Sequence, residues 1–206
     1  MRITAIEIQK NNQDRKSIFV DGEYRFSLTV EDFFKLGLKA GQEISEEELE
    51  HFVTVSSVSK CKNYVLKLLA RKLYTEKELR NKMRDKGFLT EASDEVVSFL
   101  KEYGYINDRQ FAKSYISDSI RLRKKGKRLI RMELLQKGIE EELISELLDG
   151  LETDEALDSL IEKKARSLDL SDKRNIKKIF DFCARRGYPY DEIRQAVNRF
   201  AELDEE

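Results

Sequence analysis

Apolar residues recur with helical spacing along most of the chain, and one pattern occurs three times. In each occurrence, apolar residues lie four and eight positions before a glycine that follows a lysine or arginine. That spacing places the apolar pair on one helical face, and glycine just past a helix end readily takes the left-handed backbone. The glycines are Gly87, Gly138 and Gly187, and the apolar pairs are Leu79 and Met83, Ile130 and Leu134, and Ile179 and Cys183. The pattern predicts three helices that end at these glycines.

Further apolar stripes lie before and after each of these helices. In the middle occurrence, Phe111 and Tyr115 precede the helix, and Leu143 and Leu147 follow it. Each occurrence is therefore predicted to be three short helices with a small core of its own. We expect a first repeat at 59–107, a second at 108–152 and a third at 153–206, arranged as an elongated array.

Residues 1–58 show a different pattern. Apolar and polar residues alternate on both sides of Asp21-Gly22, a dipeptide that favours a type I′ hairpin, and Ile3 begins another strand-like run. Thr29 to Leu36 is predicted to be a helix that ends at Gly37, and Ser45 with Glu48 forms a capping box before another. The fold class is therefore mainly α, with tandem three-helix repeats and a small N-terminal α+β extension that contains a β-hairpin.

Composition favours a helical protein with much solvated surface. Of the 206 residues, 38% are charged, one is proline and none is tryptophan. No apolar run approaches the roughly 20 residues of a membrane helix, and the N-terminus lacks the apolar stretch of a signal peptide. We therefore expect a cytoplasmic protein with no membrane partner. Cys61 and Cys183 are expected to be buried, reduced thiols rather than a disulfide.

The net charge of −1 conceals a strong segregation of charge. Residues 59–131 hold 20 Lys and Arg against 9 Asp and Glu, a net charge of +11. The flanks are acidic, with −4 for residues 1–58 and −8 for residues 132–206. These acidic flanks argue against indiscriminate coating of DNA.

Seven cations crowd around Gly126, where two helices of the second repeat are predicted to meet. We refer to them as the basic cluster: Arg121, Arg123, Lys124, Lys125, Lys127, Arg128 and Arg131. Such groups can replace counterions along a phosphate backbone, which gives salt-sensitive binding with little base selectivity. The alternative is a solvated face of a helix pair. A second, more diffuse basic surface is Lys67, Arg71, Lys72, Arg80 and Arg84.

Catalytic patterns are scarce in this sequence. His51 is the only histidine, which leaves little material for a catalytic triad or a multi-histidine metal site. Gly126-Lys127 is followed by Arg128 instead of serine or threonine, so the phosphate loop of an ATPase is missing. We expect no enzyme, no catalytic residues, no metal and no cofactor.

Three separated motifs resemble the bacterial RecX family of regulatory proteins. The first runs from Gly104 to Ala112 and reads GYINDRQFA. The second places Thr75 and Glu78-Leu79 before Lys86-Gly87, and the third places Lys125-Gly126 and Glu133-Leu134 before Lys137-Gly138. The resemblance is strong over residues 60–150 and weaker over 151–200. Many relatives have proline where Lys127 stands here, and the β-containing N-terminus extends beyond the minimal family core.

The resemblance implies a modulator of RecA, the recombinase that polymerises on single-stranded DNA. Its partners would be RecA and the RecA–DNA filament, with single-stranded DNA and, as an open alternative, double-stranded DNA. Family members inhibit the ATPase, strand exchange and co-protease activities of RecA, which bear on DNA repair, homologous recombination and the SOS response. A monomer is expected. The competing interpretation is a general helical DNA-binding or nucleoid-associated protein without a recombinase partner.

Overall fold

The computed structural model of the chain describes residues 1–10, 12–166, 168 and 172–203. Residues 201–203 are described by their backbone alone. Ten α-helices and three β-strands lie within the described residues. The chain forms two compact units. The first unit contains residues 1–74 and 78–106, and the second contains residues 75–77 and 107–206.

The N-terminal strands form one antiparallel sheet in the order β1-β2-β3. Their bounds are β1 (Ile3–Gln9), β2 (Asn12–Val20) and β3 (Glu23–Thr29). Asp21 and Gly22 join β2 to β3 with φ angles of 50° and 87°, as a type I′ turn requires, so the hairpin prediction is confirmed. Thr29 then caps α1 (Val30–Leu36), and Gly37 ends this helix in the left-handed conformation, also as predicted.

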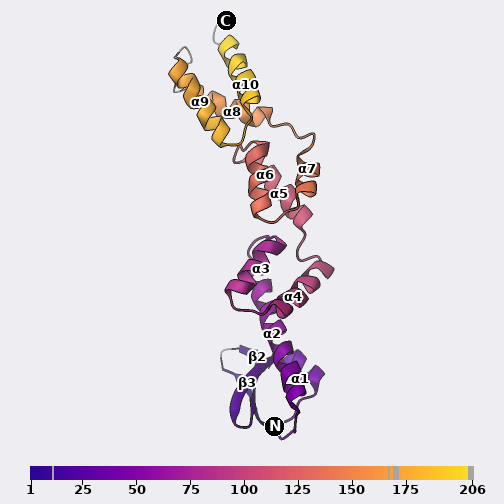
Figure 1. The fold of residues 1–206 in the computed structure, drawn as a ribbon. Helices are drawn as coiled ribbons and strands as arrows, with labels where there is room; N and C mark the ends of the chain where they lie inside the picture. Colours follow the sequence, from indigo (N-terminus) through magenta and orange to yellow (C-terminus); the bar gives the residue numbers. More distant parts are fainter. Residues whose placement is uncertain (11, 167, 169–171, 204–206) are drawn as a thin grey trace. The chain divides into compact units, whose positions relative to one another are not determined.

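A long helix, α2 (Glu46–Leu69), covers the sheet and continues into the first repeat (Figure 1). Its predicted capping box is confirmed: the Ser45 hydroxyl accepts from the Glu48 amide at 3.1 Å, and the Glu48 carboxylate accepts from the Ser45 amide at 2.8 Å. The Ser56 hydroxyl donates to the Ser27 carbonyl at 2.7 Å, which fixes α2 to β3. Residue 58, the predicted end of the extension, therefore lies inside one continuous helix.

The remaining helices form the repeats. The first repeat contains the end of α2, α3 (Glu76–Asp85) and α4 (Thr90–Glu102); the second contains α5 (Asp108–Arg121), α6 (Lys127–Gln136) and α7 (Glu141–Leu148); the third contains α8 (Asp154–Ala165), α9 (Lys173–Arg185) and α10 (Tyr190–Leu203). Each repeat has a separate cluster of buried apolar side chains. The six apolar residues that precede the repeated glycines are all 0% exposed. The tandem helical repeats and their separate cores are confirmed.

The helix ends predicted at the three glycines share one hydrogen-bond pattern. Gly87, Gly138 and Gly187 have φ angles of 85°, 87° and 90°. In each case, the amide of the next residue donates to the carbonyl five residues earlier, from Phe88 to Met83 at 3.1 Å, Ile139 to Leu134 at 3.1 Å and Tyr188 to Cys183 at 3.3 Å. This is the Schellman motif, in which a left-handed residue lets the chain satisfy the last helical carbonyls.

Both cysteines are buried and unpaired, as expected. Cys61 lies in the core of the first repeat and Cys183 in that of the third, and burial raises the pKa of each thiol to about 11. Among the helices that the structure describes, none is both long and apolar enough to cross a membrane.

Candidate nucleic-acid interface

The basic cluster lies at the bend between α5 and α6. The bend has a defined backbone, because Lys124 takes a left-handed φ of 51° and the Lys125 amide donates to the Ser119 carbonyl at 2.9 Å. Helix α6 then begins at Lys127, with Gly126 as its N-cap residue. The sequence interpretation of a helix junction at Gly126 therefore describes the local backbone well.

A glutamate from α6 supports the bend from within. The Glu133 carboxylate accepts from Lys125 Nζ at 2.6 Å and from the Tyr115 hydroxyl at 2.8 Å. The side chains of Lys125 and Glu133 are only 15% and 23% exposed. Burial, with Glu133 as the next cause, raises the pKa of Tyr115 to about 12. Lys125 is thus held in a partly buried ion pair with Glu133. Removal of the Glu133 carboxylate would leave the charge of Lys125 uncompensated.

The other six members of the cluster differ in their surroundings. Arg131 forms an ion pair with Glu141, and Arg121 lies 4.0 Å from the Asp118 carboxylate. Four cations form no ion pair with any carboxylate in the described part of the chain: Arg123, Lys124, Lys127 and Arg128. Arg123 and Arg128 are exposed, whereas Lys124 and Lys127 are half-buried. The bend therefore presents four of the seven predicted cations outside any ion pair of the described residues.

The second basic surface belongs to the first unit. Lys67 and Arg71 are exposed, and Lys72 Nζ lies 4.4 Å from the centroid of the Tyr74 ring. Arg80 pairs with Asp94 at 2.5 Å, and Arg84 donates to the Asn81 side chain at 2.9 Å. The two basic surfaces consequently lie in different units.

The third repeat braces the bend, a contact that sequence reasoning missed. The Gly126 amide donates to the Arg186 carbonyl at 2.8 Å, and the Arg128 amide donates to the Gly187 carbonyl at 3.3 Å. In return, Arg186 Nη1 donates to the Arg123 carbonyl at 2.7 Å. These three hydrogen bonds join the second and third repeats. Both glycines are visible in the sequence, but nothing local indicates that they meet.

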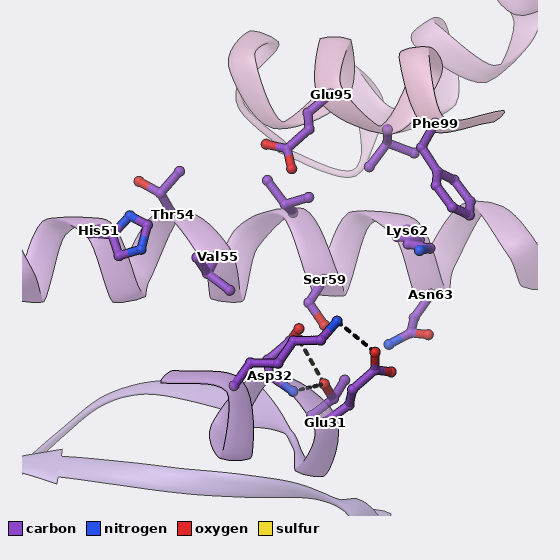
Figure 2. Close-up of a pocket in the computed structure, with 14 residues that line it drawn as sticks. Glu31, Asp32, His51, Thr54, Val55, Ser59, Lys62, Asn63, Glu95 and Phe99 are labelled. Atoms are coloured by element: carbon purple, nitrogen blue, oxygen red, sulfur yellow. Dashed lines mark hydrogen bonds and ion pairs between the residues drawn. The ribbon is translucent and has the colours of Figure 1, made fainter. Parts of the chain in front are cut away.

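A cleft of about 530 Å³ lies in the first unit between α1, α2 and α4, and sequence reasoning missed it too (Figure 2). His51 lines this cleft. Three acidic residues line it: Glu31, which pairs with Lys35 at 2.7 Å, Asp32, which accepts from the Thr29 hydroxyl at 2.6 Å, and Glu95. Lys62 Nζ sits 3.4 Å from the centroid of the Phe99 ring. The contact between Lys62 and Phe99 joins α2 to α4, and none of these contacts gives a reason to assign catalysis to His51.

Metal binding has no support in the described part of the chain. There, no three His, Cys, Asp or Glu side chains gather where they could hold a metal ion.

An α+β region followed by three-helix repeats with a cationic bend defines the class: a tandem helical-repeat protein. Four family models match the chain in order: the regulatory protein RecX N-terminal domain at residues 1–45, and the first, second and third three-helix domains of RecX at residues 61–100, 107–148 and 152–197. The chain belongs to the RecX family.

Curated relatives agree with this assignment. The regulatory protein RecX of Caldanaerobacter subterraneus subsp. tengcongensis is 35% identical over 202 residues, covering 96% of this chain and 99% of that protein. That of Clostridium perfringens strain 13 is 35% identical over 204 residues, covering 96% and 95%. These relatives are named as regulatory proteins.

Solved structures share the fold. A crystal structure of regulatory protein RecX has a TM-score of 0.74 at 24% identity and covers 96% of this chain and 98% of that one. The structure of RecX from Lactobacillus salivarius has a TM-score of 0.63 at 26% identity and covers 69% and 96%.

Proposed function

We propose that this protein binds RecA and its nucleoprotein filament on single-stranded DNA and inhibits the ATPase, strand exchange and co-protease activities. It would thereby modulate recombination, DNA repair and the SOS response in the cytoplasm, acting as a monomer. Membership of a family of regulatory proteins supports the regulatory role. RecA as the partner is what the family resemblance implies.

The observation that carries the DNA contact is the bend between α5 and α6. Its backbone is fixed by the Glu133 network and by the third repeat, and four cations stand on it without carboxylate partners. Because the backbone of the bend is already ordered, the conformational entropy lost when its cations contact a phosphate backbone is that of their side chains alone. The expected binding is therefore strong in low salt and insensitive to base sequence.

Inhibition would come from binding energy alone. A ligand shifts a conformational equilibrium only by its difference in affinity for the two states. This chain would therefore favour one state of the filament and need no cofactor or catalytic residue of its own. Inhibition would follow occupancy of the filament and cease to grow once occupancy is complete.

The DNA contact is tested with a double variant, Lys124→Glu with Arg128→Glu. Binding of single-stranded DNA should weaken, and the slope of log affinity against log salt should fall by about 1.4, at about 0.7 per lost contact. The matched control is Lys173→Glu with Lys177→Glu, which reverses two exposed lysines of α9. Circular dichroism should report unchanged helix content in both. A cluster variant with the parent's affinity and slope would overturn the assignment.

The recombinase partner is tested by measuring RecA ATPase and filament occupancy together. The protein is titrated onto RecA filaments at fixed DNA, and the bound protein is counted by co-sedimentation. ATP turnover should fall in proportion to occupancy. Retention on bare DNA that RecA leaves unchanged would favour the general DNA-binding alternative. Inhibition that grows after occupancy has reached a plateau would defeat the binding-only mechanism.

A further inference from the structure

The third repeat contains a pocket rich in cations. The pocket has a volume of about 420 Å³ and is lined by Leu160, Lys163, Lys164, Phe182 and Arg186. Three of these five residues are cationic, and none of the described residues that line the pocket is acidic. The net charge of −8 over residues 132–206 gives no hint of this local excess.

Contacts with an aromatic ring hold two of the cations in place. Lys164 Nζ lies 4.7 Å from the centroid of the Phe182 ring, and the guanidinium carbon of Arg186 lies 4.8 Å from it. Both distances are within the range of cation–π attraction. The ring therefore holds two of the positive groups that line the pocket.

Nearby carboxylates on α8 are engaged elsewhere. Glu162 accepts from Arg166 at 2.7 Å, and Asp158 accepts from Arg199 at 2.7 Å. Neither carboxylate lines the pocket. Among the described residues, neither Lys163 nor Arg186 forms an ion pair with a carboxylate.

The pocket is fixed to the basic bend through one of its own residues. Arg186 lines the pocket and also donates from Nη1 to the Arg123 carbonyl at 2.7 Å. The backbone hydrogen bond from Gly126 to Arg186 adds a second link, at 2.8 Å. The cations of the pocket and those of the bend are consequently neighbours within the second unit.

We propose that this pocket binds a phosphate of the same nucleic-acid strand that contacts the bend. This inference rests on the proposed function, and it extends the DNA surface onto the third repeat. Lys163 supplies a point charge, and the Arg186 guanidinium supplies a planar donor fork suited to phosphate oxygens. Arg186 also positions the bend through its bond to Arg123. The direct continuity with the bend favours a nucleic-acid strand over an acidic peptide as the occupant.

The decisive variant is Lys163→Glu. Lys163 is exposed and forms no hydrogen bond or ion pair with another described residue, whereas Arg186 also positions the bend. A fluorescein-labelled oligo(dT) is titrated by fluorescence anisotropy over a series of salt concentrations. The variant should bind more weakly, and its slope of log affinity against log salt should be smaller by about 0.7 than that of the parent. The control is Lys177→Glu, the same charge change on α9 outside the pocket.

Measuring Lys163→Glu beside the cluster variant Lys124→Glu with Arg128→Glu separates this inference from the proposed function. Loss in both variants, with Lys177→Glu unchanged, supports the continuous surface. Loss in the cluster variant alone overturns the pocket and leaves the DNA-binding bend intact. Loss of DNA binding in Lys163→Glu alone removes the bend as a DNA contact, and so overturns the continuous surface proposed here. Unchanged DNA binding with weaker RecA binding in Lys163→Glu assigns the pocket to an acidic protein surface and also overturns this inference.

Discussion

The first and third repeats end their middle helices with the same motif but use it differently. At Gly87, an added Cβ atom would meet nothing within 4 Å, so this helix end is open. At Gly187, the same atom would collide with the backbone nitrogen and side chain of Leu129 at the start of α6. The left-handed glycine is therefore only a helix end in the first repeat. In the third repeat, Gly187 also packs against the start of α6, and we call this contact between the second and third repeats the joint.

Close approach at this joint needs a glycine on each side. A Cβ atom on Gly126 would lie 2.5 Å from the Gly187 carbonyl oxygen, far inside any normal contact distance. Removing both side chains lets the two backbones exchange hydrogen bonds directly. The difference from Gly87 teaches that a local motif predicts the backbone conformation but not which element packs against it.

The largest expected effect is the loss of stability in Gly187→Ala. This change forces alanine into a left-handed backbone, which costs about 1–2 kcal/mol, and adds a clash of about 1–3 kcal/mol. Gly87→Ala should show only the first cost, because its surroundings are open. Gly126→Ala should show only the second, because Gly126 has an ordinary φ of −79°. Urea unfolding followed by circular dichroism ranks the three variants.

Equal losses in Gly87→Ala and Gly187→Ala would show that the joint adds nothing to stability. If Gly126→Ala unfolds at the same urea concentration as the parent, the backbones of the second and third repeats do not approach each other as closely as the structure shows.

The two buried thiols can locate such a loss in one repeat. With a thiol pKa of about 11, about one thiol in a thousand is ionised at pH 8, so Ellman's reagent should react slowly with the folded protein. In a Cys61→Ala background, Gly187→Ala should speed the reaction of Cys183 at least tenfold, corresponding to about 1.4 kcal/mol easier opening. In a Cys183→Ala background, Gly187→Ala should leave Cys61 unchanged. Equal acceleration of both thiols would mean that the repeats open together.

Local structure was predictable from the sequence because neighbouring residues determine it. The Asp21-Gly22 turn, the Ser45 capping box and the three glycine helix ends each depend on a few consecutive residues, and all are confirmed. The buried faces follow equally from the helical period. The elongated arrangement of the repeats stays a prediction that small-angle scattering can test, since a compact chain of this length would have a radius of gyration of about 17 Å.

The candidate site was less predictable because tertiary contacts decide which charges stay available. Lys125 looks like any other member of the basic cluster, yet Glu133 from the next helix neutralises it. Arg186 reaches Arg123 over 63 residues of sequence. The helical period shows which face of a helix is apolar, but it does not show which other helix covers that face.

A moderate effect is expected when the support beneath the bend is removed. Glu133→Gln leaves the half-buried Lys125 ammonium without a carboxylate, which should lower stability by about 1–3 kcal/mol. The pKa of Tyr115 should also fall from about 12, because Glu133 contributes to its rise. Thermal unfolding gives the first quantity, and absorbance at high pH, with Tyr115→Phe as the reference, gives the second. An unchanged tyrosine titration would contradict the hydrogen bond between Tyr115 and Glu133.

The smallest expected effect concerns Glu192, which reports on the joint through its charge. Burial raises the pKa of Glu192, Asp154 raises it further, and Lys127 of α6 opposes both. The folded state therefore holds this proton more tightly than the unfolded state, so the contribution of Glu192 to stability falls as pH rises from its usual pKa through the raised one. Glu192→Gln should accordingly gain stability relative to the parent as the pH rises above 4.5, the ordinary pKa of glutamate, as urea midpoints can show. If the joint is formed in solution, Lys127→Gln should raise the pKa of Glu192 further in an NMR titration. If the pKa of Glu192 is the same in Lys127→Gln as in the parent, α6 and α10 are not close enough in solution to form the joint described above.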